Sequence, residues 1–469
     1  MNAPLIWMVS PLIIAVVFWL LQKRVTLVIV LSTALCALLA LLAWAFPIAS
    51  AVKLGLWSFE VQSSLTVLGR RFVLDSGDRS FLALIYGIGA FWFFGTRIAG
   101  AHRHFIPIGM AVLALMVAAM AVDPFLYAAL VVEIAVLLSI PMLVPPGRVV
   151  GQGIARYLIF QTLALPFLLF AGWAAAGVEA NPTDSRLLLQ AVVFLGLGFA
   201  FWLAIFPFYT WVPLLSQESH AYETGFILGL LPSVMLLLML KFLDNFAWLR
   251  AYPLMPVGLQ LCGALMVVTA GIWAAFQKTL PRLFGYAVIM ESGFALLSIS
   301  LQSQAGVEAF TASLFPRMLA LALWALASSA LEQEGISADF DGIRGQFRRY
   351  PLISSGLVLA YFSLAGLPLL GGFPTRLVLL ENLAQKSMPI MLWVLLGNVG
   401  FLLSGLRMLA MLVTWSARYG NQENWEINEK WPQAALIVIG AAGLLLIGVF
   451  PGFFLSGLLT ILQSFNHLF

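Results

Sequence analysis

Charged residues are scarce in this sequence. Asp, Glu, Lys and Arg make up 9% of its 469 residues, whereas 62% are hydrophobic and the mean hydropathy is +1.01. Soluble domains carry about 25% charged residues, so this shortage excludes a chain that folds mainly in water. The formal net charge of +4 is spread along the chain and indicates neither a nucleic-acid surface nor an anion-binding patch.

Cysteine is also scarce. The two cysteines, Cys36 and Cys262, each lie within an apolar run and have no metal-ligand or redox spacing. Iron–sulfur clusters are usually held by four cysteines, and the sequence has no glycine fingerprint for a dinucleotide. The chain is therefore expected to hold no metal, no cofactor of its own and no catalytic residue for redox chemistry.

Long apolar runs are what the sequence has in abundance. Runs of about 20 residues recur along the chain, each long enough to cross a bilayer core of roughly 30 Å. In residues 128–144 only Glu133, Ser139 and Pro141 interrupt such a run, whereas barrel strands would alternate every second residue. The sequence therefore predicts an all-α membrane protein with about 14 transmembrane helices.

The segments between the runs indicate the topology. Residues 50–79 are polar enough to leave the membrane and alternate weakly, which predicts a short extramembrane hairpin. The first run is followed at once by Lys23 and Arg24 without a small-residue cleavage site, so we expect a retained helix. Loops on the side of these two residues carry more Lys and Arg than the opposite loops. The positive-inside rule therefore predicts that both termini lie outside the cytoplasm.

Two of the predicted helices, the seventh near residues 188–212 and the twelfth near 351–381, contain helix-breaking residues. Proline removes an amide donor and glycine weakens a helix, so both helices are expected to break near mid-membrane. Broken helices at matching places in two halves point to a transport site between repeats, and simple packing kinks are the alternative. The predicted break residues are Pro207, Pro213, Gly366, Pro368, Gly372 and Pro374.

The broken segments resemble a known family. The segment 207–213 followed by Glu218, and the stretch from Asp341 to 363–373, are similar to the antiporter-like, proton-conducting membrane subunits of respiratory complex I. These are NADH-quinone oxidoreductase subunits of the M or N type, related to subunits of multisubunit cation/proton antiporters. The resemblance covers about residues 75–415. It implies two inverted five-helix repeats, with broken helices 7 and 12, that conduct protons along a polar axis.

The resemblance also implies a division of the chain into four parts. These are residues 1–103 with helices 1–3 and the hairpin at 50–79, residues 104–243 as the first repeat, residues 254–415 as the second repeat, and residues 416–469 with helix 14.

Several positions keep ionisable residues where the family transfers protons. Glu133 stands at the family's glutamate position in the fifth helix, and Arg376 stands at its lysine position in the twelfth. An ionisable group at bilayer centre costs roughly 3 kcal/mol or more, so it normally faces a partner or water. A structural glutamate, or a charge network that neutralises itself without conducting, is the alternative. The proton-path candidates are Glu133, Glu218, His220, Glu291, Arg317, Arg376, Glu381 and Arg407.

Other family positions have lost their proton carriers. Trp202 stands at the family's lysine position in the seventh helix, Ser233 at that in the eighth, and Leu321 and Ala325 at the histidine and lysine positions of the eleventh. A proton relay needs groups that titrate or hold water, and Trp, Leu and Ala do neither. The sequence therefore predicts a partly degenerate channel.

Two main classes of function stay open, and a stand-alone secondary transporter is a third possibility. The first is a non-redox membrane-arm subunit of a proton-pumping NADH:quinone oxidoreductase of the respiratory chain, in which partner subunits hold flavin, iron–sulfur clusters and quinone. The second is a non-conducting structural spacer of the same fold. A membrane hydrogenase and a cation/proton antiporter complex are alternative parents. We expect a multi-pass protein of the bacterial plasma (inner) membrane that contacts lipid and other membrane-arm subunits, and no nucleic acid.

Overall fold

The structure is a computed structural model that describes residues 2–48, 51–54, 57–144, 147, 149–181, 185–414, 427–465 and 467–468. Within these residues the chain is mostly helical, and 11 helices are long and apolar enough to cross a membrane. Shorter apolar helices accompany them at Leu5–Leu20, Phe105–Ala121, Pro351–Leu364 and Pro451–Ser464. The predicted all-α membrane class is confirmed, but the predicted count of about 14 transmembrane helices is not.

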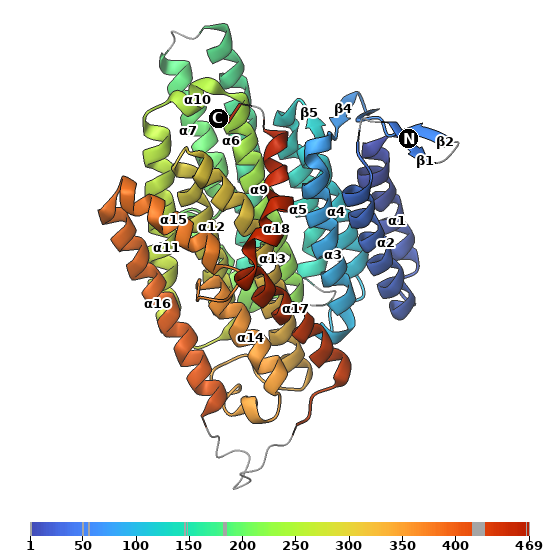
Figure 1. The fold of residues 1–469 in the computed structure, drawn as a ribbon, viewed down its shortest axis with the longest axis vertical. Helices are drawn as coiled ribbons and strands as arrows, with labels where there is room; N and C mark the ends of the chain where they lie inside the picture. The colour runs from blue at the N-terminus through green and yellow to red at the C-terminus, as the bar shows by residue number, and fades with distance from the viewer. Residues whose placement is uncertain are drawn as a thin grey trace.

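The N-terminal helices run from blue to cyan in Figure 1. They are a π-helical turn at Leu5–Val9, α1 (Ser10–Leu20), α2 (Val25–Ala45), α3 (Arg79–Ala99), α4 (Phe105–Ala121) and α5 (Ala128–Leu143). Here α2 packs along α3, while α1 and α5 both pack against α4. Every residue of α4 is buried, so α4 is the core helix of this edge of the bundle.

Two antiparallel hairpins connect α2 to α3, where the sequence predicted one. The first pairs β1 (Ala51–Leu54) with β2 (Trp57–Glu60), and the second pairs β3 (Ser64–Val67) with β4 (Arg70–Val73). β4 also pairs with β5 (Val122–Asp123), which directly follows α4. Residues 50, 55 and 56 of the predicted hairpin lie outside the described residues. The predicted β-structure is confirmed, but its number of hairpins was wrong.

The centre of the bundle is formed by α9, α12 and α13, each of which is 94% buried over its apolar window. In Figure 1 they lie between α11 and α16 on one side and α3 to α5 on the other. A charged residue in the middle of any of these three helices is therefore enclosed by protein. The bounds of the central helices are α6 (Gln152–Ala180), α7 (Ser185–Trp202), α8 (Trp211–Glu218), α9 (Ala221–Asn245), α10 (Ala247–Ala251), α11 (Leu254–Phe276), α12 (Leu280–Ser300) and α13 (Gln304–Gln333).

The C-terminal helices complete the bundle. They are α14 (Pro351–Leu364), α15 (Phe373–Lys386), α16 (Met388–Val413), α17 (Trp431–Val449) and α18 (Pro451–Leu459). α16 lies at the outer edge against α11, and α17 packs on α13 and α14. The single helix predicted near 433–460 was wrong, because Pro451 starts a new helix. Both ends of the chain lie at the same end of the molecule (Figure 1).

The first predicted break lies between α7 and α8. α7 ends at Trp202, and the backbone leaves the helix with Ala204 in the left-handed region at φ +55°. A 3-10 turn at Phe208–Thr210 then leads into α8. Pro207 lies in this connection, and Pro213 lies in the first turn of α8, where the amide has no intrahelical partner to lose. The predicted break of the seventh helix is confirmed.

The second predicted break lies between Leu364, the last residue of α14, and Phe373, the first residue of α15. Gly366 has φ +74°, a conformation that only glycine adopts without strain. Pro368 lies in the connection, and Pro374 is the second residue of α15, where proline is well tolerated. The predicted break of the twelfth helix is therefore confirmed.

Gly372 allows the two sides of this second break to approach closely. A Cβ atom there would lie 2.1 Å from the carbonyl oxygen of Ser363, which is main chain and cannot swing away. Gly372→Ala is expected to lower the free energy of unfolding by about 2 kcal/mol, measured by thermal unfolding in detergent. Gly196→Ala in α7, where a Cβ meets nothing within 4 Å, is the control and should be neutral or slightly stabilising. Equal losses in both variants would contradict close packing at the break.

Candidate functional site

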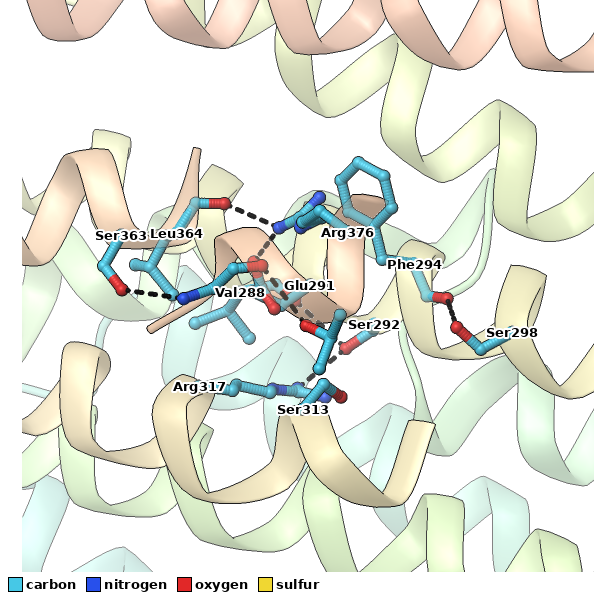
Figure 2. A network of polar contacts seen from close by, with 12 residues as sticks. Val288, Glu291, Ser292, Phe294, Ser298, Ser313, Arg317, Ser363, Leu364 and Arg376 are labelled. Atoms are coloured by element: carbon cyan, nitrogen blue, oxygen red, sulfur yellow. Dashed lines mark hydrogen bonds and ion pairs between the residues drawn. The ribbon is translucent and has the colours of Figure 1, made fainter. Parts of the chain in front are cut away.

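Three charged side chains lie together inside the C-terminal half of the bundle. Glu291 comes from α12, Arg317 from α13 and Arg376 from α15, and we call them the buried charge cluster. Their exposed fractions are 7%, 3% and 7%. Figure 2 shows Glu291 between the two arginines. Charged groups are rare inside a membrane-spanning bundle and normally have partners, so each contact in this cluster matters.

Arg376 connects the two sides of the broken helix and also contacts α12. Its Nη2 forms an ion pair with Oε1 of Glu291 and donates a second hydrogen bond, 2.6 Å long, to the carbonyl oxygen of Leu364. The guanidinium carbon also lies 3.2 Å from the centroid of the Phe294 ring, a cation–π contact. Leu364 ends α14, and the last carbonyls of a helix lack intrahelical partners. The break therefore supplies the acceptor that positions the arginine.

Arg317 has fewer partners than Arg376. Its Nη2 donates to the Ser292 hydroxyl at 3.2 Å, but its Nε and Nη1 have no hydrogen-bond partner among the described residues. The same is true of Nη1 of Arg376. Both arginines line a cavity of about 20 Å³, which is enough for one water-sized guest. The other polar residues that line it are Glu291, Ser298, Ser313, Ser363 and Thr375.

Two of the proton-path candidates lie outside this cluster. Glu381 is exposed on the surface of α15. Arg407 donates to the carbonyl oxygen of Ala275, and its guanidinium carbon lies 5.5 Å from the centroid of the Phe340 ring. Of the five charged candidates in this half, three therefore form the cluster, and Glu381 and Arg407 lie apart from it.

In the N-terminal half, Glu133 is buried and has a neutral partner. It accepts a hydrogen bond of 2.7 Å from the Thr162 hydroxyl. Nearby, Trp202 is 2% exposed, packs edge-to-face on Phe199, and accepts from Gln161 at its carbonyl oxygen at 3.2 Å. An indole carries no exchangeable charge, so the side chain at the family's lysine position fills space instead of relaying a proton.

The other positions that lost a proton carrier also hold side chains that do not titrate. Ser233 donates to the carbonyl oxygen of Gly229 in its own helix at 2.7 Å, which satisfies its hydroxyl proton locally. Leu321 and Ala325 are both 0% exposed within the apolar core. None of the three presents a titrating group to the bundle interior.

Polar cavities lie at the two ends of α9, but its middle is apolar. Ser233 is the only polar residue between Phe226 and Leu240, a distance of about 22 Å along the helix. The cavity at the first end, about 560 Å³, is lined by residues that include His102, Glu218, His220 and Glu332. The cavity at the other end, about 540 Å³, is lined by residues that include Arg71, Asp75, Asp78, Asp123 and Lys241.

Glu218 and His220 belong to the first of these cavities. Glu218 accepts from the main-chain amides of Gly153 and Ile154 at 2.7 and 3.4 Å, and it therefore caps the N-terminus of α6. The His220 ring lies 5.8 Å from that of His102 in an edge contact. Both predicted residues thus lie at an entrance to the bundle, and Glu218 also has a structural task.

Sequence reasoning missed a contact between His102 and Glu223. Nδ1 and the main-chain amide of His102 both contact Oε1 of Glu223, at 2.9 and 2.7 Å, and Glu223 is 0% exposed. A glutamate in the first turn of an apolar helix was a usable signal, because ionisable groups within a membrane span are usually functional. Lys241 at the other end of α9 was also missed, although it carries the same signal of an ionisable group in an apolar helix. Its Nζ donates to the carbonyl oxygen of Met120 at 2.6 Å.

Comparison with known proteins agrees with this geometry. Residues 175–404 match the family model described as "NADH:quinone oxidoreductase/Mrp antiporter, TM". The chain resembles the antiporter-like membrane subunits. This confirms the resemblance found in the sequence, while the division into two five-helix repeats stays a prediction.

The similar sequences are subunits of respiratory enzymes. The chain is 25% identical over 330 residues to NADH-quinone oxidoreductase subunit N 1 of Herpetosiphon aurantiacus. The aligned region covers 65% of this chain and 65% of the relative. It is 31% identical over 228 residues to subunit N of Rhodopseudomonas palustris, 49% of this chain and 46% of that one. The chain thus spans about half to two thirds of the length of these relatives. With subunit 14 of Thermus thermophilus it shares 26% identity over 87% of this chain and 93% of the relative.

Solved structures share the fold at low identity. A chain of the Mrp complex from Dietzia sp. DQ12-45-1b superposes with a TM-score of 0.84 at 16% identity, over 99% of this chain and 97% of that one. A chain of respiratory complex I from Thermus thermophilus gives 0.75 at 20% identity, over 99% and 98%. A chain of an archaeal membrane-bound sulfane sulfur reductase gives 0.82 at 16% identity, over 100% and 98%. At these identities the likeness establishes the fold alone.

Proposed function

We propose that this chain is a membrane-arm subunit of a proton-pumping NADH:quinone oxidoreductase, and that only its C-terminal half takes part in proton translocation. The observation that carries the proposal is the ion pair between Glu291 and Arg376, buried beside a polar cavity at the broken helix. Broken helices next to intramembrane charges are the usual construction of an ion pathway. The relatives named as NADH-quinone oxidoreductase subunits N and 14 favour this parent complex.

Glu291 is the proton carrier in this proposal. Arginine does not deprotonate in proteins, so Glu291 is the one member of the cluster that exchanges a proton. Arg376 has two acceptors, Glu291 and the Leu364 carbonyl. When Arg376 holds Leu364 alone, the carboxylate loses its direct ion-pair partner, which favours uptake of a proton; when the ion pair re-forms, the proton leaves. Hydroxyl groups, which both donate and accept, line its route at Ser292, Ser298, Ser313 and Thr375.

The parent complex is tested by gentle extraction of the full chain through an affinity tag, with mass spectrometry of the proteins that co-purify. Recovery of flavin and iron–sulfur subunits together with NADH-dependent quinone reduction is the expected result. Recovery with hydrogenase or cation-antiporter subunits instead would overturn the assignment. The similarity to a chain of an Mrp complex makes the second outcome a specific alternative.

The N-terminal half is expected to be dispensable for pumping. Glu133→Gln keeps the side-chain shape and removes the charge, and Gln can still accept from Thr162. Because Trp202 and the apolar middle of α9 offer no proton carrier, the variant should retain most NADH-driven proton uptake in inverted vesicles, read with a pH-sensitive dye. A loss as large as that of Glu291→Gln would show that the N-terminal half conducts.

The specific alternative is a spacer that docks between conducting subunits. The apolar middle of α9, about 22 Å long, favours this spacer role for the N-terminal half. Under this alternative Glu291→Gln and Glu133→Gln would both leave proton uptake unchanged in a complex that still assembles. Equal rates in the two variants and the wild type would therefore select the spacer.

The proposed setting completes the assignment. The chain is proposed to lie in a bacterial inner membrane with both termini outside the cytoplasm and to contact other membrane-arm subunits. Flavin, iron–sulfur clusters and quinone are proposed to belong to partner subunits. Comparing labelling of cysteines introduced at Lys23 and at Asp75, with a reagent that does not cross the membrane, tests the orientation: only the Asp75 position should react in intact cells.

A further inference from the structure

The buried charge cluster carries an excess positive charge. Arg317 and Arg376 contribute two positive charges, and Glu291 is the one carboxylate among the described residues that line the cavity. All three side chains are more than nine-tenths buried. An uncompensated charge in such a place is strongly unfavourable, since neither water nor a mobile counter-ion screens it. Protonation of Glu291 would increase the excess, and arginine does not release its proton.

The donors that lack partners belong to the same two arginines. Nε and Nη1 of Arg317 and Nη1 of Arg376 have no acceptor among the described residues. Buried guanidinium N–H groups are nearly always hydrogen-bonded. Because both arginines line the cavity of about 20 Å³, one small guest can accept hydrogen bonds from both.

Three of the lining hydroxyl groups direct their protons elsewhere. Ser298 donates to the carbonyl oxygen of Phe294, Ser313 to that of Phe310, and Thr375 to that of Gly372. Figure 2 shows the first of these bonds beside the cluster. The guanidinium groups are therefore the charged donors at the cavity that lack acceptors, which suits a guest that only accepts.

We propose that the cavity between Arg317 and Arg376 binds one small monovalent inorganic anion of about chloride size. The anion balances the charge of the cluster, since two arginines then face one carboxylate and one halide. It also supplies the acceptors that the unpartnered guanidinium N–H groups lack. A single water fits the same space and accepts the same bonds, but it leaves the excess charge in place. The site does not depend on proton transport, so it stands or falls separately from the proposed function.

The test uses the full chain, purified with whatever subunits remain bound. Bromide replaces chloride during crystallisation, and anomalous diffraction at the bromine edge locates it. We expect a peak within hydrogen-bond reach of both guanidinium groups. In parallel, the unfolding temperature is measured against chloride concentration at constant ionic strength, with gluconate as the replacement anion, which is too large for the cavity. We expect a saturable rise with chloride and bromide.

Arg317→Gln provides the variant and Arg407→Gln the matched control. Arg407 is also an arginine within a helix of the bundle, but it contacts the Ala275 carbonyl away from the cavity. Removal of a charged donor should weaken halide binding at least about tenfold, whereas the control should keep the full response. The absence of a bromide peak in the wild-type protein, or an unfolding temperature that does not change when chloride replaces gluconate, would overturn the proposal. The wild-type peak decides the matter even where Arg317→Gln does not fold.

Discussion

Glu291→Gln is expected to destabilise the protein more than replacement of either arginine in the buried charge cluster. The wild-type side chains carry two positive charges and one negative charge. Glutamine at position 291 leaves both positive charges without a carboxylate. Arg376→Met, in contrast, leaves Arg317 and Glu291, which balance each other across the same cavity. The order of the effects therefore follows the charge that each variant leaves behind and not the number of contacts it removes.

The expected magnitude is large. Removal of one partner from a buried ion pair costs about 3–5 kcal/mol, because the other charge is left unpaired in a poorly polarisable interior. Glu291→Gln should lie in this range, and Arg376→Met should lie clearly below it. Thermal or denaturant unfolding of the purified chain in one detergent measures both. Glu381→Gln is the matched control, because Glu381 is exposed on α15 and outside the cluster. A larger loss for Arg376→Met than for Glu291→Gln would contradict the charge count.

The same variant should abolish proton pumping where the complex still assembles. Gln cannot take up and release a proton, and the proposed route through the cavity has no other titrating group among the described residues that line it. NADH-driven acidification of inverted vesicles is the readout, corrected for the amount of assembled complex. Retained pumping at the wild-type rate would remove Glu291 from the route.

The fold was predictable because hydrophobic length and helix-breaking residues are local properties. Pro207 predicted the interruption after α7, and Gly366 predicted the one after α14; the structure has both. The break after Val449 was missed, although Pro451 stands there, because the apolar run continues through it. Hydropathy alone could not find this break, and proline alone does not decide it either, since α5, α6, α9 and α13 each continue through an internal proline.

The site was only partly predictable because its partners are distant in sequence. The identities of Glu291 and Arg376 marked them as intramembrane charges, but their pairing depends on how α12 packs against the broken helix. Glu381 and Arg407 looked equivalent in the sequence and turned out to face elsewhere. The pairing of His102 with Glu223 was likewise invisible, since it joins residues that are 121 positions apart.

Ala325→Lys tests whether a lost lysine could simply be restored. Ala325 is 0% exposed and packs closely on Gly225. A Cβ atom added to Gly225 would lie only 2.6 Å from the Cβ of Ala325. The cavity beside it, lined by residues that include Thr224 and Ser328, measures about 10 Å³ and is too small to hydrate an ammonium group. A lysine there would be a buried, unpaired charge. We therefore expect loss of the folded protein, or a lower free energy of unfolding by several kcal/mol.

Ala325→Met separates the charge from the volume. Methionine has a similar length without a charge, so it measures the overpacking cost, which is typically about 1–3 kcal/mol. The difference between the two variants in the unfolding measurement is the cost of the charge alone. If Ala325→Lys folded as well as Ala325→Met and raised proton uptake in a Glu291→Gln background, the core around position 325 would have to be hydrated. An apolar, tightly packed core predicts instead that Ala325→Lys is much less stable than Ala325→Met and does not raise proton uptake. The reason is that side chains of the core fill the space around position 325, where the family has a lysine.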